Sequence, residues 1–149
     1  MKKGFSMIEL LIVVAILGAM VALSVNSFSR AKHIAALGSS QATLRQARTA
    51  LELGLVQVVE ELGGVTISDE VITEQSQISN SNLLRELLWG FQLPTRISLL
   101  LSVDSNCLGS DCIQSSITVD HENACKVVQN TQFGDGQDIT ITIPKPDGC

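Results

Sequence analysis

The sequence predicts an α+β protein in which one long N-terminal α-helix packs on a small antiparallel β-sheet head. Three observations lead to this prediction. An apolar run at residues 5–25 is followed by an amphipathic pattern that no proline interrupts before Leu62. Segments with the alternation of β-strands follow in the second half of the chain. All four cysteines come after residue 106, which is typical of a small exported domain with disulfides.

The helix is expected to run from Phe5 to about Leu62. At 1.5 Å per residue, the apolar run spans roughly 30 Å, the thickness of a bilayer core. Beyond it, apolar residues recur every three or four positions and Gly63-Gly64 ends the pattern. The residues of this stripe are Leu44, Ala47, Leu51, Leu55, Val58 and Leu62. The first half of the helix therefore suits a membrane, and the second half must lie against the head.

One carboxylate, Glu9, interrupts the apolar run. An ionised side chain at that depth costs roughly 2.5–3.5 kcal/mol on insertion scales, so Glu9 is a candidate functional residue. Lys2 and Lys3 favour a cytoplasmic N-terminus, an asymmetry that Arg30 and Lys32 weaken. An ordinary signal anchor or a cleavable secretory peptide is the alternative interpretation. Neither explains the carboxylate, and the residues after the run make a poor secretory cleavage site.

The segment KKGFSMIELLIVVAILG resembles the class III signal of type IV pilins and the related pseudopilins. The resemblance covers roughly residues 2–30 and implies the type IV pilin fold. It implies that a prepilin peptidase/N-methyltransferase cuts after Gly4 and methylates the new amine on Phe5. It also implies that this amine pairs with Glu9 of a neighbouring subunit.

Two positions of the helix bear on its flexibility. Gly18 matches a glycine that many pilins have in the middle of this segment, and the resemblance implies flexibility there. Many pilins also have a kinking proline late in the segment, where this chain has Asn26. Flexibility of the helix therefore rests on Gly18 alone.

The chain divides into a leader at 1–4, the helix at 5–62 and a globular head at 63–149. Residues 5–25 form the membrane and filament-core segment, and the end of the head is bounded by disulfides. Six elements are expected in the head. A short strand at 65–67 lies in a polar loop that ends at residue 80, and a helix follows at 80–91. Strands at 96–103 and 113–119 pair as an antiparallel hairpin, and a short helix at 121–129 and a strand at 138–143 complete the head.

The expected environments of four side chains follow from their positions. Trp89 and Phe91 are expected to pack in the core. His33 is expected on the solvent or headgroup side of the long helix. His121 lies between two acidic residues and is expected to form a surface ion pair with them.

An even number of cysteines in an exported domain indicates disulfides, and four cysteines allow three pairings. Cys107–Cys112 and Cys125–Cys149 is the favoured pairing. The second bond closes a loop of about 25 residues, worth roughly 3 kcal/mol in the chain-entropy model. A zinc site is the alternative, but only the first two cysteines have a usual ligand spacing. The late pair also resembles the disulfide-bounded region of pilins, which secretion pseudopilins mostly lack.

Composition argues against several classes of function. The formal charge is −5, and the chain has no Tyr and one Trp. Nucleic-acid binders usually have a basic face, often with aromatic residues, so this composition argues against nucleic-acid binding. No phosphate loop, nucleophile elbow or paired-histidine motif is present, so we expect no enzyme activity, cofactor or metal. Residues 135–138, DGQD, are a weak candidate for calcium because a dedicated loop has more acids.

The resemblance thus implies a structural subunit of a type IV pilus filament. Such a subunit is stored in the inner membrane with a periplasmic head and polymerises through its N-terminal helix into an extracellular filament. The expected partners are copies of itself, other pilins, the prepilin peptidase and the inner-membrane assembly machinery. A minor pilin or tip adhesin, and a pseudopilin of type II secretion, are the alternatives.

Overall fold

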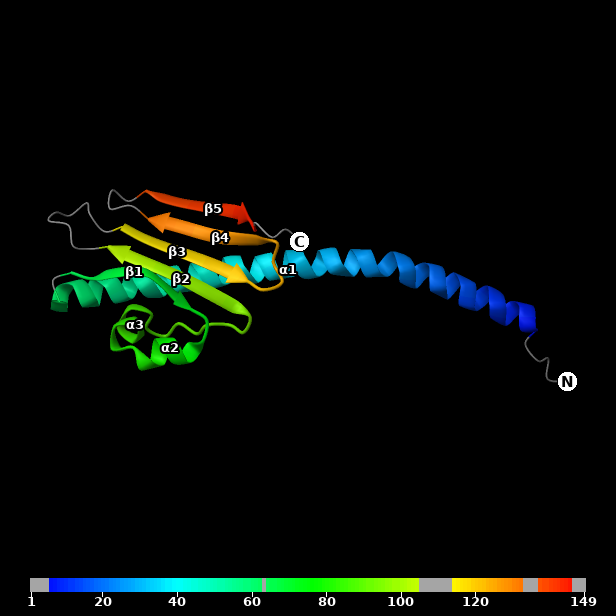
Figure 1. Ribbon diagram of the computed structural model, residues 1–149, viewed down its shortest axis with the longest axis horizontal. Coiled ribbons are helices and arrows are strands. Elements are labelled where there is room, and N and C mark those ends of the chain that lie inside the picture. Colours follow the sequence, from blue (N-terminus) through cyan, green and yellow to red (C-terminus); the bar gives the residue numbers. More distant parts are fainter. Residues whose placement is uncertain (1–5, 63, 105–113, 133–136, 146–149) are drawn as a thin grey trace.

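A computed structural model describes residues 6–62, 64–104, 114–132 and 137–145 (Figure 1). Its main feature is α1, Met7–Leu62, a continuous helix of 56 residues. The first half of α1 extends away from the head, and the second half lies along one face of a β-sheet (Figure 1). The expected long helix is therefore confirmed, with Phe5 outside the described residues.

The head is a five-stranded antiparallel sheet in which each strand pairs with the next one in the sequence. Two short helices connect the first two strands and lie outside the sheet (Figure 1). This arrangement confirms the predicted α+β class. The elements are β1 Thr66–Ile72, α2 Gln75–Asn80, α3 Asn82–Leu87, β2 Ile97–Asp104, β3 Gln114–His121, β4 Lys126–Gln132 and β5 Asp138–Pro144.

The predicted hairpin forms the centre of the sheet. β2 and β3 are antiparallel, with Leu99 opposite Val119 and Leu101 opposite Ile117. Alternate residues of both strands are buried, and Ser115 is buried with the apolar ones. Successive side chains of a strand point to opposite faces, so every second residue is buried when one face of the sheet covers the core. The sequence therefore predicted the pairing of these two strands.

The second half of α1 packs on β3, β4 and α3. All five described members of the predicted stripe, from Leu44 to Val58, are buried, and the side chain of Leu62 lies outside the described residues. At Gly54 the helix comes so close to α3 that an added Cβ would lie 2.3 Å from the carbonyl oxygen of Leu87. Glycine at this position therefore sets the distance between the two helices.

The prediction of a helix at 121–129 is wrong, because residues 126–132 form strand β4. The valines Val127 and Val128 favour an extended chain, and β4 pairs with β3 on one side and β5 on the other. Only a turn precedes it, with the backbone N–H of Ala124 donating to the carbonyl of His121. Pairing with two distant strands overrides the local helical spacing.

The segment at 65–80 is more regular than expected. β1 continues past residue 67 to Ile72, with an irregularity in its pairing at Asp69, whose φ is 45°. Helix α2 follows, and the side chains of its N-cap residue Glu74 and of Gln77 form a capping box. The expected helix at 80–91 is also shorter, because α3 ends at Leu87.

The prediction that Phe91 packs in the core is confirmed, because its side chain is 5% exposed. The same prediction for Trp89 is wrong, because Trp89 is 72% exposed. Gly90 lies between them with φ of 73°, a left-handed conformation that favours glycine. The chain turns at this glycine, and only one of the two rings enters the core. Trp89 is left as an exposed aromatic ring on the head.

Candidate functional site: the protruding N-terminal helix

The protruding part of α1 is apolar on all sides. Every residue from Ser6 to Ser24 is exposed. The most apolar 18-residue stretch of the helix has a mean hydropathy of 2.7, and none of it is buried in the chain. Burying one large apolar side chain is worth about 1.5–3 kcal/mol, so this surface requires either lipid or other protein around it. By length and composition α1 is the one helix in the described part of the chain that suits a membrane span.

Glu9 lies in the first turn of α1. Its carboxylate accepts a hydrogen bond from the backbone N–H of Ser6, with 3.0 Å between nitrogen and Oε2. This contact satisfies one of the N–H groups that a helix start leaves without a partner. The acidic group is also favourable there because the N-terminal end of the helix dipole is positive. Glu9 therefore has an internal partner within its own chain.

The sequence prediction missed this capping role of Glu9. The signal was present, because Ser6-Met7-Ile8-Glu9 has the Ser-x-x-Glu spacing of a capping box. Gly4 and Phe5, the residues of the predicted cleavage and methylation, lie outside the described residues. Pairing of Glu9 with the Phe5 amine of a neighbour stays a prediction.

Gly18 lies within the unbroken helix, where an added Cβ would have no heavy atom within 4 Å. No contact within the described chain therefore requires glycine at this position. Figure 1 shows that α1 curves gently along its protruding half. The predicted flexibility at Gly18 stays a prediction, and the open space around it suits a close approach by a neighbouring helix.

His33 marks where α1 meets the head, and the expectation that it faces solvent or headgroups is wrong. Its Nδ1 lies 2.7 Å from the carbonyl oxygen of Asn123, and the side chain is partly buried. The buried stripe of α1 begins earlier than predicted, with Ala36 and Ser40 also buried. His33 lies one turn before Ala36 on this same face, so it turns toward the head.

The expected ion pair of His121 with its neighbours is also wrong. Its Nδ1 accepts a hydrogen bond from the backbone N–H of Asn123 at 3.0 Å. Lys145 lies 2.6 Å from Asp120, and Arg96 lies 3.9 Å from Glu122. The two acidic residues therefore pair with cations that come from other parts of the chain.

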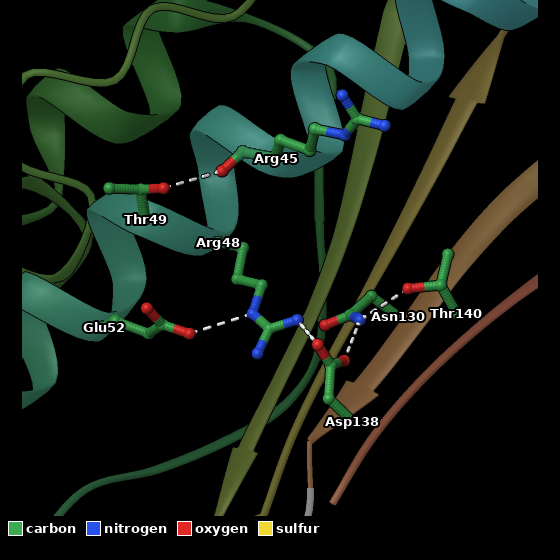
Figure 2. Close-up of polar contacts among 7 residues, drawn as sticks. All are labelled: Arg45, Arg48, Thr49, Glu52, Asn130, Asp138 and Thr140. Atoms are coloured by element: carbon green, nitrogen blue, oxygen red, sulfur yellow. Dashed lines mark hydrogen bonds and ion pairs between the residues drawn. The ribbon is translucent and has the colours of Figure 1, made fainter.

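A polar cluster joins α1 to the far edge of the sheet (Figure 2). Arg48 on α1 donates to Glu52 at 2.8 Å and also to Asp138, the first residue of β5. Asn130 on β4 is 3% exposed and donates to both Asp138 and Thr140. All residues of β5 are exposed. The cluster therefore anchors a strand that has no buried side chain.

Asp138 was the only described acid of the candidate calcium loop, and in the structure it accepts hydrogen bonds from Arg48 and Asn130. Residues 135 and 136 lie outside the described residues. Within the described ranges, no group of three His, Cys, Asp or Glu residues is placed to hold a metal ion.

Cys125 is half-buried and disulfide-bonded. The other three cysteines lie outside the described residues, so both predicted pairings stay predictions. The carbonyl of Cys125 accepts a hydrogen bond from the backbone N–H of Lys145 at 3.0 Å. Lys145 comes four residues before Cys149, and four residues reach at most about 14 Å. The bond between Cys125 and Cys149 is therefore within reach.

Comparison with known families finds one match, to the prokaryotic N-terminal methylation motif, at residues 1–25. No curated protein and no solved structure matches the chain. The motif implies processing by a prepilin peptidase and assembly into pilus-like filaments, and with the exposed apolar helix it indicates anchoring in a membrane. Proteins of this kind have structural roles. This motif, at the start of a protruding helix on an α+β head, supports a type IV pilin-like protein with a class III signal peptide.

Proposed function

We propose that the chain is a structural subunit of a type IV pilus filament. One observation carries this proposal: residues 7–24 form a fully exposed apolar helix outside the head, within the match to the N-terminal methylation motif at residues 1–25. The subunit is stored in the inner membrane with its head in the periplasm. Assembly with copies of itself and with other pilins, by the machinery of that membrane, moves it into an extracellular filament.

The driving force for assembly follows from the surface of α1. A helix satisfies its own backbone hydrogen bonds, so it can leave lipid without exposing polar groups. Bundling the apolar halves of many copies in a filament core replaces contacts with lipid by contacts with protein. The open surface at Gly18 allows neighbouring helices to approach closely there.

Glu9 supplies the specificity in this proposal. In the isolated chain its carboxylate caps the helix, and in the filament it also pairs with the positive amine of Phe5 from the next copy. Pairing offsets the cost of removing both charges from water or headgroups. Because the pair forms in only one axial register of two neighbouring helices, it also aligns the subunits.

The head offers a second surface for contacts between copies. Leu53, Val56 and Trp89 are exposed by 66%, 62% and 72%. Leu53 and Trp89 line a groove of about 570 Å³ between α1 and the turn that follows α3. Exposed apolar side chains grouped in this way are typical of protein contacts. They support packing of heads against each other around the filament core.

The first test is the mature N-terminus. We expect cleavage between Gly4 and Phe5, with one methyl group added to the Phe5 amine. Mass spectrometry of the protein purified from cells with an active prepilin peptidase measures both. Cells that lack the peptidase are the control and should retain Met1 or Lys2 as the first residue. A mature chain that begins near Asn26 would instead show ordinary secretory cleavage and contradict the proposal.

A further inference from the structure

Basic residues gather at the end of the head from which α1 protrudes. β2 and β4 begin at this end, and β3 and β5 finish there (Figure 1). Five of the eight Lys and Arg residues that follow Phe5 lie at this end. We call these five residues the basic collar: Arg30, Lys32, Arg96, Lys126 and Lys145. The acids that the structure describes beside these five cations are Asp120 and Glu122, in a chain with a net charge of −5.

The collar contains a groove of about 500 Å³ between α1 and the turns of the sheet. Lys32 and Arg96 face this groove from opposite sides, and the hydroxyl-bearing residues Ser39 and Thr95 also line it. His121 completes the wall at the end of β3. The lining therefore combines two positive charges with small hydrogen-bonding groups, which is the chemistry that binds a phosphate.

The two cations of the groove are weakly engaged by the chain itself. Arg96 lies 3.9 Å from Glu122, and the two side chains are 64% and 71% exposed. Such an exposed pair contributes little, and the guanidinium retains further donors. Within the described ranges the side chain of Lys32 has no hydrogen bond or ion pair. Lys145 differs, because it is held by Asp120 and by the carbonyl of His121.

The backbone at Arg96 is strained. Its φ is 66°, in the left-handed region that residues with a Cβ seldom adopt. The conformation is held by a hydrogen bond of 3.0 Å from the backbone N–H of Glu122 to the Arg96 carbonyl. Residues held in this way gather at ligand sites, where the surrounding structure fixes a side chain in place.

The end of the groove at Lys32 is the part nearest the lipid headgroups when α1 spans a bilayer. Lys32 follows Val25, the end of the apolar run, by seven residues, or roughly 10 Å along the helix. The headgroup layer extends about 5–8 Å beyond the hydrocarbon core. Helical side chains lean toward the N-terminus, and long basic side chains reach back to the interface. From there the ammonium of Lys32 can reach back to the layer of lipid phosphates.

We propose that the groove between Lys32 and Arg96 binds the phosphate of an anionic phospholipid in the leaflet from which the head emerges. Binding holds the head in one orientation on the membrane before assembly. The inference rests on the membrane storage of the subunit that the proposed function includes. It also explains why positive residues lie on the non-cytoplasmic flank of the span, where they weaken the charge asymmetry that orients the chain.

The test uses the full chain in nanodiscs of phosphatidylcholine, with and without phosphatidylglycerol. Backbone amide exchange is measured at residues 95–98 and 121–124, which border the groove. We expect exchange there to slow several-fold when phosphatidylglycerol is present. Lys32→Gln/Arg96→Gln should abolish this protection. The matched variant Arg45→Gln/Arg85→Gln removes the same charge away from the groove and should retain the protection.

Equal exchange in the two lipid compositions would overturn the proposal, as would equal protection in the two double variants. A further experiment adds inorganic phosphate to the chain in phosphatidylcholine nanodiscs and measures the same amide exchange. Full protection by phosphate alone would identify a site for free anions and overturn the lipid assignment. A nanodisc that holds one chain requires no polymerisation, so a negative result here leaves the filament proposal intact. If cells made no filaments, the protection of the groove by phosphatidylglycerol in nanodiscs would still stand.

Discussion

Replacing Glu9 with either alanine or glutamine is expected to stop filament assembly while leaving insertion, cleavage and folding of the head intact. Insertion should be unimpaired because removing a carboxylate from a bilayer is favourable. The head should fold because it lies far along the chain from the first turn of α1. Assembly should fail because the amine of an incoming Phe5 would be buried without a counter-charge. Removing one partner of a buried pair costs roughly 3–5 kcal/mol, and the cost recurs at every subunit.

The two substitutions together separate the two roles of Glu9. Glutamine has an oxygen that still accepts the hydrogen bond from the Ser6 N–H, so Glu9→Gln retains the cap and removes the charge. Glu9→Ala removes both. Loss of a cap alone costs about 0.5–2 kcal/mol. If the charge pair controls assembly, the two variants should fail alike.

Filaments counted by electron microscopy, with cleaved subunits quantified in the membrane fraction, measure this outcome. Glu60→Gln removes an exposed carboxylate near the other end of α1 and should assemble normally. Normal filament numbers with Glu9→Gln, but not with Glu9→Ala, would show that Glu9 acts through the cap and would exclude the charge pair.

Replacing Cys149 with serine is expected to lower the free energy of unfolding of the head by roughly 2–5 kcal/mol. The predicted bond from Cys125 closes the loop that contains β4 and β5. No residue of β5 is buried, so the strand depends on pairing with β4 and on the contact between Asp138 and Arg48. Without the bond the unfolded chain gains loop entropy, and little apolar burial at β5 opposes its detachment.

Urea unfolding of the full chain in micelles, followed by a signal of the head, gives the magnitude. Cys112→Ser is the matched control, because its predicted bond closes a much shorter loop and should cost about 1 kcal/mol less. Peptide mapping without reduction should show Cys125 joined to Cys149 and Cys107 joined to Cys112. Free thiols, or zinc bound in equal amount to the protein, would refute this pairing.

Elements whose pattern reflects burial on one face were predictable from the sequence. The stripe of α1 and the alternation of β3 fall into this group, because each places its apolar residues in one core. β4 was not predictable in this way. The residues from Cys125 to Val128 also suit a helical face, and only pairing with β3 and β5 makes the segment a strand.

The candidate sites show the same division between local and distant causes. The capping role of Glu9 is local, and its Ser-x-x-Glu signal was readable in the sequence. His33 contacts Asn123, and Arg48 contacts Asp138, in each case 90 residues away. No local pattern encodes such contacts. The groove of the basic collar also depends on the fold, because it brings Lys32 next to Arg96 and His121.

The most direct test of the filament account is electron cryo-microscopy of filaments sheared from cells that make this chain. The account predicts that the chain is a main component, with residues 6–24 of each copy packed in the filament core. It also predicts that the carboxylate of Glu9 lies within about 4 Å of the Phe5 amine of a neighbouring copy, the distance of an ion pair. Filaments that lack this chain, or that place its apolar helix outside the core, would contradict the account.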